Sequence, residues 1–472
     1  MSRRKEKKEI IDELVIEAIG FEGISIARLE GIVHFVRGGV PGDKVKALRL
    51  RKRKNRIESH ILEIVQPSQD RINPKCDYFG DCGGCSWQNM NYQKQLEWKQ
   101  SHVRDAFQRQ ENIFPEEILA VVSAPNEFYY RNKMEFSFGG SRWLTASEIK
   151  SGEEMGGKNF ALGLHAKGRF DKVIDVKKCH ITDSRAESVL GLVRNKAQEL
   201  DVPAFNLRTS EGFLREFGFR VSVLTGEILV NLITFSDGEE YPEFMKWFYE
   251  DFPNESEATS VIHSVNGTKS PVNIQKSTLI SGSGFLTENI LGVEYKISPR
   301  SFFQTNTFQL NNFIQKIIEY ANLDKSNIVW DLYCGAGSIS LPAAKNCGEI
   351  IGIEMNEGAV SDANENAKSN NILNSTFYAA DLHGKKMPEL LSTLPSPDVV
   401  IVDPPRAGIH KNLLSHLLDI SPKRIVYVSC NPMTQSRDCK ILEEKYAVKK
   451  ILPFDMFPQT WHIESIALLE LK

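Results

Sequence analysis

One cysteine near the end of the chain stands in a setting that suits chemistry. Cys430 lies in the segment 429–432 (SCNP), directly after the apolar residues 425–428. Such a run predicts a buried strand, so Cys430 is expected at the carboxyl edge of a sheet, near a helix N-terminus. A thiol there can have its pKa lowered and act as a thiolate nucleophile. A structural cysteine buried in the core is the equal alternative on spacing alone.

A carboxylate further along could complete such a site. Glu464 ends the segment 457–464 (FPQTWHIE), and His462 precedes it by two positions. Methyl transfer to carbon 5 of a pyrimidine needs a thiolate that first adds at carbon 6, because carbon 5 is otherwise a poor nucleophile. It then needs a general base to remove the carbon 5 proton. Cys430 suits the first role and Glu464 the second, with His462 as the rival base.

Acidic residues recur where successive predicted strands end. Residues 329–338 (VWDLYCGAGS) predict a strand with Asp331 near its end, followed by a Gly-x-Gly turn that opens a helix. With two of the three glycines of the dinucleotide fingerprint, this turn favours a smaller nucleoside cofactor over a nicotinamide. Glu354, Asp381 and Asp403 follow later strands, and Glu354 stands where an acid accepts both ribose hydroxyls. Each alone could be a helix cap, but their repeated placement predicts a cofactor site.

Three cysteines crowd together early in the chain. Cys76, Cys82 and Cys85 lie within ten residues, whereas the whole chain of 472 residues has eight cysteines. That number is too small for a disulfide framework, so metal binding or catalysis is the better interpretation. On the residues alone, zinc and an iron–sulfur cluster are nearly level, since both take four cysteine ligands.

The elements that must position these residues differ along the chain. Strands are predicted over residues 13–18, 23–29, 32–36, 44–50 and 57–65, separated by glycine turns. Five such strands predict a small closed barrel, such as an oligonucleotide-binding fold. Eight Lys or Arg and no acid between Lys44 and Arg56 suggest a polyanionic partner, although the formal net charge is only −3. The alternative is an SH3-like or structural barrel with a merely solvated basic strand.

The rest of the chain predicts a helix at about 92–110 and a β-rich region with strands at 133–138 and 220–235. After residue 299, strands alternate with helices. The strands are expected at 328–332, 350–354, 376–380, 398–402 and 424–429, and the helices at 338–345, 357–369 and 434–444. Two last strands, near 449 and 466, could pair antiparallel. The alternation predicts a mostly parallel, doubly wound sheet. The predicted fold class is multidomain α/β, with domains over 1–68, 69–298 and 299–472.

Several segments form a combination that one family shares. They are 38–43 (GGVPGD), 301–306 (SFFQTN), 331–338 (DLYCGAGS), 403–408 (DPPRAG), 429–432 (SCNP) and 457–464 (FPQTWHIE). Over nearly its whole length the chain resembles the TRAM-domain RNA uracil-5 methyltransferases. The resemblance implies Cys430 as nucleophile and Glu464 as base. It also implies S-adenosyl-L-methionine as cofactor, bound by Gln304, Tyr333, Ser338, Glu354, Asp381 and Asp403; the family often has Asn where Ser338 stands.

The resemblance also implies a role for the cysteine group. In the family, the spacing of Cys76, Cys82 and Cys85 with one distant cysteine holds a [4Fe–4S] cluster, and Cys179 lies at the matching place. Such a closed cluster is expected to shape the central domain or hold RNA rather than do redox chemistry. The N-terminal barrel is then a TRAM domain whose basic strand contacts phosphates.

The implied substrate is RNA, and the family members with this cluster and barrel favour 23S ribosomal RNA. Transfer RNA is the alternative. A cytosine-C5 methyltransferase and a non-catalytic RNA-binding or ribosome-assembly protein are rivals; intact Cys430 and Glu464 argue against the second. No apolar run approaches the roughly 20 residues of a membrane span, so a cytoplasmic monomer without a membrane partner is expected.

Overall fold

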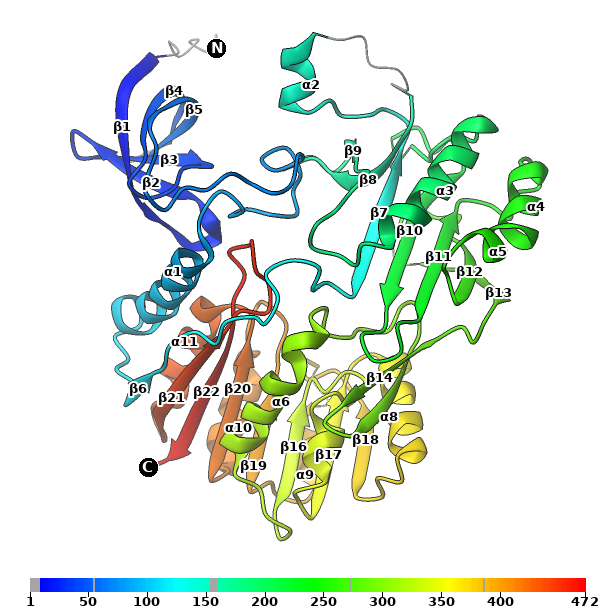
Figure 1. The fold of residues 1–472 in the computed structure, drawn as a ribbon. Coiled ribbons are helices and arrows are strands. Elements are labelled where there is room, and N and C mark those ends of the chain that lie inside the picture. Colours follow the sequence, from blue (N-terminus) through cyan, green and yellow to red (C-terminus); the bar gives the residue numbers. More distant parts are fainter. Residues whose placement is uncertain (1–8, 54–55, 153–158, 207, 271–272, 385–386) are drawn as a thin grey trace, which may run out of the picture.

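The computed structural model describes residues 9–53, 56–152, 159–206, 208–270, 273–384 and 387–472. An N-terminal barrel and a central sheet lie above a C-terminal sheet covered by helices (Figure 1). The loop between the last two strands rises from the C-terminal sheet toward the other two parts.

The N-terminal strands form the predicted barrel. They are β1 (Glu9–Ile19), β2 (Ser25–Leu29), β3 (Ile32–Arg37), β4 (Lys44–Arg53) and β5 (Arg56–Gln66), with a short turn of helix, η1 (Phe21–Gly23), after β1. Within the described residues these five strands close in the order β1-β2-β3-β5-β4, which confirms the closed barrel. The basic strand is β4, and its charge is partly balanced by ion pairs of Lys46 with Asp12 (3.1 Å) and Arg49 with Glu9 (2.8 Å) on β1. Lys54, part of the predicted basic run, lies outside the described residues.

The central sheet has the order β13-β12-β11-β10-β7-β8-β9. Its strands are β7 (Lys133–Gly139), β8 (Ala161–His165), β9 (Val173–Asp175), β10 (Leu214–Val221), β11 (Ile228–Thr234), β12 (Ser260–Val265) and β13 (Lys276–Ser281). The helices of this region are α2 (Ala146–Ser151), α3 (Ala186–Glu199), α4 (Pro242–Glu250) and α5 (Phe252–Glu255). The predicted single strand at 220–235 is wrong. A turn in which Gly226 has a φ of 74° divides it, so β10 and β11 pair antiparallel.

The C-terminal sheet has the order β18-β17-β16-β19-β20-β22-β21-β6. Its strands are β6 (Glu117–Ile118), β16 (Ile328–Leu332), β17 (Glu349–Glu354), β18 (Ser375–Ala379), β19 (Val399–Val402), β20 (Arg424–Ser429), β21 (Tyr446–Phe454) and β22 (Glu464–Leu471). β16 to β20 pair in parallel, whereas β22 pairs antiparallel with both β20 and β21. The predicted parallel sheet and closing antiparallel pair are therefore confirmed.

Helices cover both faces of this sheet because its strands are apolar on both sides. Val329 and Ile350 pack in the core that contains α6 (Thr307–Ala321), α7 (Ser340–Ala344) and α8 (Glu357–Ser369). The next residues, Trp330 and Ile351, pack in the opposite core with α9 (Met387–Thr393), α10 (Lys411–Ile420) and α11 (Pro432–Leu442). The hairpin of β14 (Leu286–Ile290) and β15 (Val293–Ile297) joins the first core. The sheet is thus doubly wound, as predicted.

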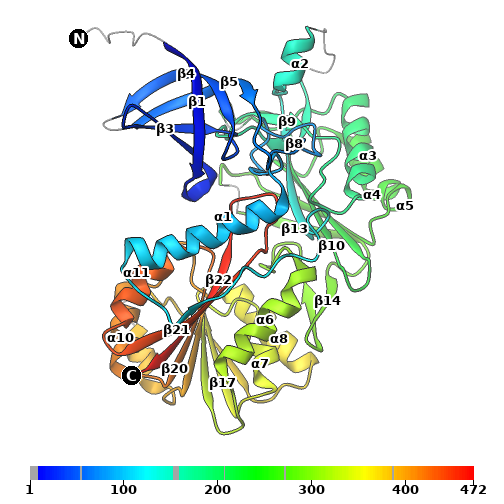
Figure 2. The same ribbon diagram turned by 60° about the vertical axis from the view of Figure 1, so that its left-hand side comes forward.

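A helix from the first quarter of the chain also packs on the C-terminal sheet. It is α1 (Tyr92–Arg104), and it runs beneath the barrel and along the top of the sheet (Figure 2). After Arg104 the predicted helix continues as a wider turn, η2 (Asp105–Gln110). Val103 and Phe107 lie fully buried in the same core as α11. The helix therefore packs against α11 and β21, and β21 is the neighbour of β22 in the sheet.

Candidate active site

A cavity of about 1150 Å³ opens at the carboxyl edge of the parallel strands. It lies where the strand order reverses, between the β16-β17-β18 and β19-β20 halves of the sheet. Open α/β sheets bind ligands at such a point, because loops from the two halves diverge there. Of the predicted site residues, the following line it: Gln304, Tyr333, Glu354, Asp381, Asp403, Cys430 and Glu464.

The turn after β16 brings backbone groups to this cavity. Tyr333 and Gly335 adopt positive φ angles of 66° and 55°, which fold the chain sharply between the strand and α7. The N–H of Gly335 donates to Glu354 Oε2 (3.2 Å), and the N–H of Asn356 donates to Glu354 Oε1 (2.8 Å). Both carboxylate oxygens are therefore fixed at the rim, where they can accept hydroxyl groups of a ribose.

Two further predicted cofactor residues, Asp381 and Ser338, lie differently with respect to the cavity. Asp381 accepts a hydrogen bond from the N–H of His383 (2.8 Å), which holds its carboxylate at the cavity. Ser338 is not among the residues that line the cavity, so its predicted contact has no support from this geometry. Asp331 lies beneath the turn, fully buried, and accepts a hydrogen bond from Ser340. Burial, with a smaller contribution from Glu354, raises the pKa of Asp331 to about 7.

Cys430 lies immediately beyond β20, half-buried, with its side chain at the cavity. The next residue, Asn431, caps α11 by accepting the N–H of Met433 (3.1 Å). The pKa of the Cys430 thiol is raised to about 12, first by burial and then by the carboxyl groups of Glu464 and Asp403, while Arg406 opposes them. The pKa of the thiol is therefore raised rather than lowered as expected, because burial and two carboxyl groups outweigh the helix terminus.

Glu464 is opposite Cys430. The antiparallel register that pairs Ser429 with Ser465 places Cys430 and Glu464 next to each other, one residue further along. Glu464 is 6% exposed, and burial together with the nearby Asp403 raises the pKa of its carboxyl well above the usual range. A carboxylate held in such a site is a stronger base than one in water. The pairing of two neighbouring strands thus brings the predicted nucleophile and base together.

His462, the rival base, also lines the cavity. Its ring stacks on Trp461 with centroids 4.1 Å apart. Burial lowers the pKa of His462 to about 4, with further lowering by the charges of Arg406 and Lys99. The ring is neutral at pH 7. His462 is therefore a weak base. Its stacking on Trp461 suits a role in orienting the segment that leads to Glu464.

Some cavity residues carried no prediction. Arg131, from the segment before β7, contributes a cation, and His383 places its Nε2 3.2 Å from the Tyr333 hydroxyl. Phe302 lines the cavity with a side chain that is 70% exposed. Phe302 belongs to the SFFQTN segment, so its position in a motif was the available signal. Nothing local to Arg131 marks it, since tertiary packing alone brings it to the cavity.

The four predicted metal ligands gather in a second place. Cys76, Cys82, Cys85 and Cys179 all line one small cavity between the segment before α1 and the loop after β9. Burial raises the pKa of all four thiols, to about 11 for Cys82 and about 12 for Cys85. Among the described residues, no three metal-binding side chains are grouped closely enough to hold a metal ion. The donor set nevertheless fits a [4Fe–4S] cluster, in which each iron takes its own cysteine.

Comparison with known proteins is consistent with this architecture. The sequence model of the tRNA (Uracil-5-)-methyltransferase family matches residues 285–472. An uncharacterized RNA methyltransferase of Bacteroides thetaiotaomicron is 38% identical over 96% of this chain and 99% of its own. One from Chlorobaculum tepidum is 37% identical over 93% of this chain and 92% of its own. The solved Pyrococcus abyssi tRNA (uracil-54, C5)-methyltransferase, in complex with S-adenosyl-L-homocysteine, is 28% identical with a TM-score of 0.74, covering 97% of this chain and 100% of that one.

The doubly wound sheet with a cavity at its carboxyl edge, together with the likeness to a methyltransferase solved with S-adenosyl-L-homocysteine, identifies the class as S-adenosylmethionine-dependent methyltransferases. The matches over nearly the full length narrow the class: the chain belongs to the RNA uracil-5 methyltransferase family. Its substrate is RNA. In the part of the chain that the structure describes, no helix has the length and apolar character needed to span a membrane.

Proposed function

We propose that this enzyme methylates carbon 5 of a uridine in 23S ribosomal RNA through a covalent adduct with Cys430. The observation that carries the proposal is the pairing of Cys430 with Glu464 across β20 and β22, inside the cavity that also contains Glu354 and Asp381. A thiol alone would suit many reactions. A thiol opposite a buried carboxyl group suits one that needs a nucleophile and, later, a base.

The chemistry divides into addition and elimination. Cys430 loses its proton to water in the open cavity, and its thiolate forms a bond to carbon 6 of the uracil, which moves the electron pair of the double bond onto carbon 5. Carbon 5 then takes the methyl group, and the electron pair of the broken S–CH3 bond stays on the donor sulfur, so that S-adenosyl-L-homocysteine is the leaving group. Glu464 removes the carbon 5 proton, the electron pair of that C–H bond re-forms the double bond, and the thiolate of Cys430 leaves. Arg406, which lowers the pKa of the thiol, stabilises the thiolate in both steps.

S-adenosyl-L-methionine, when bound, supplies the methyl group. Glu354 is placed to accept the ribose hydroxyls, and Asp381, Gln304, Tyr333 and Asp403 complete the lining. These contacts remain proposals, as does the contact of Ser338.

The RNA substrate has two candidates. The cysteine quartet supports 23S ribosomal RNA, since the family members with such a quartet and a TRAM barrel mostly act there. Transfer RNA is favoured by one observation: the Pyrococcus abyssi transfer-RNA enzyme aligns with 97% of this chain, so the barrel does not by itself distinguish the two classes. In either case the target base must leave its stack to reach Cys430, which costs least in an RNA loop.

The remaining assignments concern the two other parts of the chain. Residues 1–68 are proposed to act as a TRAM domain that contacts phosphates through β4, and residues 69–298 to carry a [4Fe–4S] cluster. The convergence of Cys76, Cys82, Cys85 and Cys179 on one cavity supports the cluster. The cluster would order the segment that connects the barrel to α1, and no catalytic step depends on it.

The experiment uses the purified enzyme with radiolabelled methyl donor and two transcripts, one of 23S ribosomal RNA and one of transfer RNA. Digestion to nucleosides followed by chromatography identifies the product. Formation of 5-methyluridine on the ribosomal transcript is the expected result. Product on the transfer RNA alone would reassign the substrate, and no 5-methyluridine on either would overturn the proposed function.

A further inference from the structure

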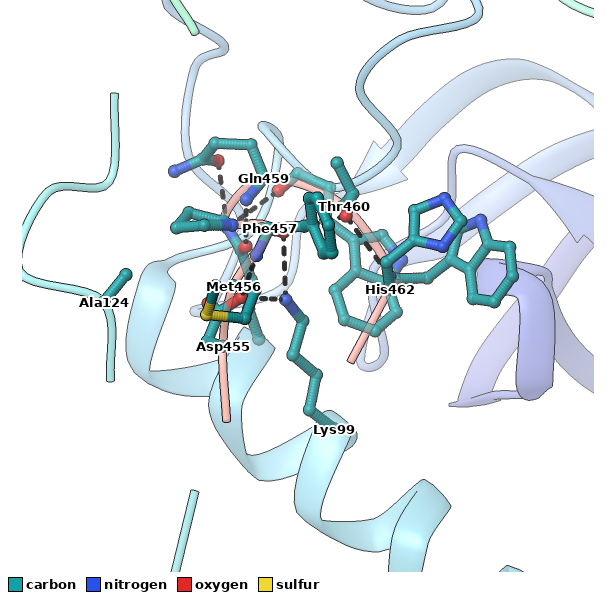
Figure 3. A network of polar contacts seen from close by, with 12 residues as sticks. Lys99, Ala124, Asp455, Met456, Phe457, Gln459, Thr460 and His462 are labelled. Atoms are coloured by element: carbon teal, nitrogen blue, oxygen red, sulfur yellow. Dashed lines mark hydrogen bonds and ion pairs between the residues drawn. The ribbon is translucent and has the colours of Figure 1, made fainter. Parts of the chain in front are cut away.

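The loop between β21 and β22, residues 455–463, is held by polar groups from outside the C-terminal domain. Hereafter it is called the catalytic loop, because it ends at Glu464. Its consecutive backbone carbonyls each accept hydrogen bonds from a different part of the chain. Figure 3 shows one of these contacts, in which Lys99 reaches the loop at Asp455 and Phe457. The acceptor–donor pairs are Met456 with Asn306 (3.0 Å), Phe457 with Lys99 (3.1 Å), Pro458 with Tyr130 (3.1 Å) and Gln459 with the N–H groups of Ser86 and Trp87 (both 3.0 Å).

Lys99 of α1 is the charged member of this set. Its Nζ lies 2.6 Å from Asp455 Oδ1 at the start of the catalytic loop, and both side chains are 0% exposed. The same Asp455 oxygen accepts the N–H of Phe457 (3.1 Å), so the ammonium group and the loop backbone share one carboxylate. Burial lowers the pKa of Lys99, and the charge of Asp455 opposes that shift. The ion pair therefore holds the first residues of the catalytic loop through both a side chain, that of Asp455, and a backbone group, that of Phe457.

Stability alone does not explain a buried ion pair. Removing two charges from water is costly, and well-packed apolar residues of similar size often stabilise a protein as well or better. What Lys99 contributes in particular is a set of hydrogen bonds with defined directions. It joins the side chain of Asp455 to the carbonyl of Phe457, and an apolar replacement would fill the space without fixing either atom.

The constraint extends from Lys99 to the cavity. Gln95, one helical turn earlier on α1, exchanges two hydrogen bonds of 3.0 Å with Gln459, which adopts a φ of 67°. Thr460 donates to the carbonyl of Phe457 (2.8 Å) and accepts the N–H of His462 (3.2 Å). Phe457, Thr460, His462 and Glu464 then line the active-site cavity. One face of α1 thus holds the backbone that leads to the predicted base.

We propose that Lys99 is a positioning residue for the removal of the carbon 5 proton, acting through Asp455 and the catalytic loop on Glu464. The inference rests on the proposed function, in which Glu464 is the base. Lys99 lies outside the active-site cavity, so it has no direct contact with the reacting atoms. Its role is to keep the carboxylate at the distance and angle that proton transfer requires.

The test is Lys99→Met in the full-length enzyme, with ordinary uridine-containing RNA as substrate. We expect kcat to fall about tenfold to a hundredfold, with the KM for RNA unchanged within about twofold. A covalent protein–RNA band should also accumulate on denaturing gels, because addition continues while elimination slows. A merely structural role would lower all steps together and would not enrich the adduct. Lys94→Met is the matched control: it removes a partly exposed lysine of the same helix and should leave kcat unchanged.

Asp455→Asn is the second variant, because loss of the ammonium group could unfold the protein. It keeps the size of the side chain and an oxygen for Lys99, so the loop is weakened rather than lost. We expect Asp455→Asn to change the enzyme as Lys99→Met does, with a smaller fall in kcat and a smaller accumulation of the covalent adduct. If Lys99→Met does not fold, Asp455→Asn decides. Full kcat in the folded variants, or a loss without adduct, would overturn the positioning role, whereas a wild-type enzyme that makes no 5-methyluridine would instead refute the proposed function.

Discussion

At the scale of single residues, burial and neighbouring charges shift the proton affinity of both reactive groups in the same direction. Burial and acidic neighbours raise the pKa values of Cys430 and Glu464, while Arg406 is the nearby cation that opposes the shift at Cys430. A protonated thiol is protected from oxidation and alkylation, since the thiolate is the reactive form. Formation of the reactive thiolate is therefore opposed by burial and the two carboxyl groups and favoured by Arg406.

The first prediction concerns the pH dependence of this thiol. In the ligand-free enzyme, alkylation of Cys430 by iodoacetamide should increase about tenfold per pH unit up to about pH 9 without a plateau, because a thiol with a pKa of about 12 is still mostly protonated there. Asp403→Asn removes a negative neighbour and should speed the reaction at a given pH. Peptide mass spectrometry measures the rate at Cys430 separately from the other cysteines. A rate that already levels off at about pH 9, as it would for an ordinary thiol, would show that the pKa is not raised.

The second prediction separates nucleophile from base. Cys430→Ala should abolish both methylation and the covalent RNA adduct, whereas Glu464→Gln should lower turnover by about a hundredfold or more and trap the adduct. Gel shifts under denaturing conditions and nucleoside analysis measure the two outcomes. Cys347→Ala, a buried core cysteine away from the cavity, is the control and should retain activity. Normal turnover by Glu464→Gln would return His462 to consideration as the base.

At the scale of elements, the site depends on the close approach of neighbouring strands and turns. Gly352 lies in β17 beneath the turn after β16, and a Cβ there would come within 2.8 Å of Cys334 Sγ and also against the Phe377 ring. The missing side chain thus makes room for the turn that carries Gly335. The local sequence shows a glycine in a strand, but only packing shows why it is needed.

The third prediction follows from that contact. Gly352→Ala should destabilise the protein by about 1–3 kcal/mol through overpacking, and should weaken S-adenosyl-L-homocysteine binding because the turn must shift. Thermal unfolding and calorimetric titration measure the two effects. Gly191→Ala in α3 is the matched control, since a Cβ there meets no described atom within 4 Å, and it should stabilise the helix by about 0.5–1 kcal/mol. Equal stability of the two variants would contradict the packing argument.

At the scale of the whole molecule, all three parts of the chain meet at the catalytic loop. Gly23 of the barrel faces Trp461, the Trp87 N–H from the cysteine-rich segment bonds to Gln459, and Tyr130 from the central region bonds to Pro458. RNA that bridges the barrel and the central sheet would therefore contact elements that also hold the loop.

The fourth prediction tests the cluster in this arrangement. Anaerobically purified protein should be brown and contain about four iron atoms, and Cys85→Ser should lose iron and lower the unfolding temperature. Cys439→Ser, in the core of the C-terminal domain, is the control and should keep its iron. Metal analysis and visible absorption give the result. A colourless protein with stoichiometric zinc would refute the iron–sulfur assignment.

The sequence predicted most of the secondary structure that local residue patterns specify. Apolar runs and glycine turns identified the barrel strands and the parallel strands, while the 220–235 strand was wrong because Gly226 was not recognised as a turn. The helix α6 was missed although Leu310, Phe313, Ile314 and Ile317 follow a helical spacing and are buried. The sequence contained the signal for this helix, because apolar residues at helical spacing can be recognised from the local sequence alone.

The sequence by itself determined which side chains meet at the carboxyl edge of the sheet. Parallel strands in one sheet end at the same edge, so residues that follow those strands, such as Glu354, Asp403 and Cys430, must come together. The tertiary structure alone decided the rest: that Glu464 faces Cys430 through an antiparallel register, that burial raises their pKa values, and that Lys99 reaches the catalytic loop. These depend on contacts between residues that are not neighbours in the sequence, up to 356 positions apart for Lys99 and Asp455, and packing sets such contacts whereas local pattern does not encode them.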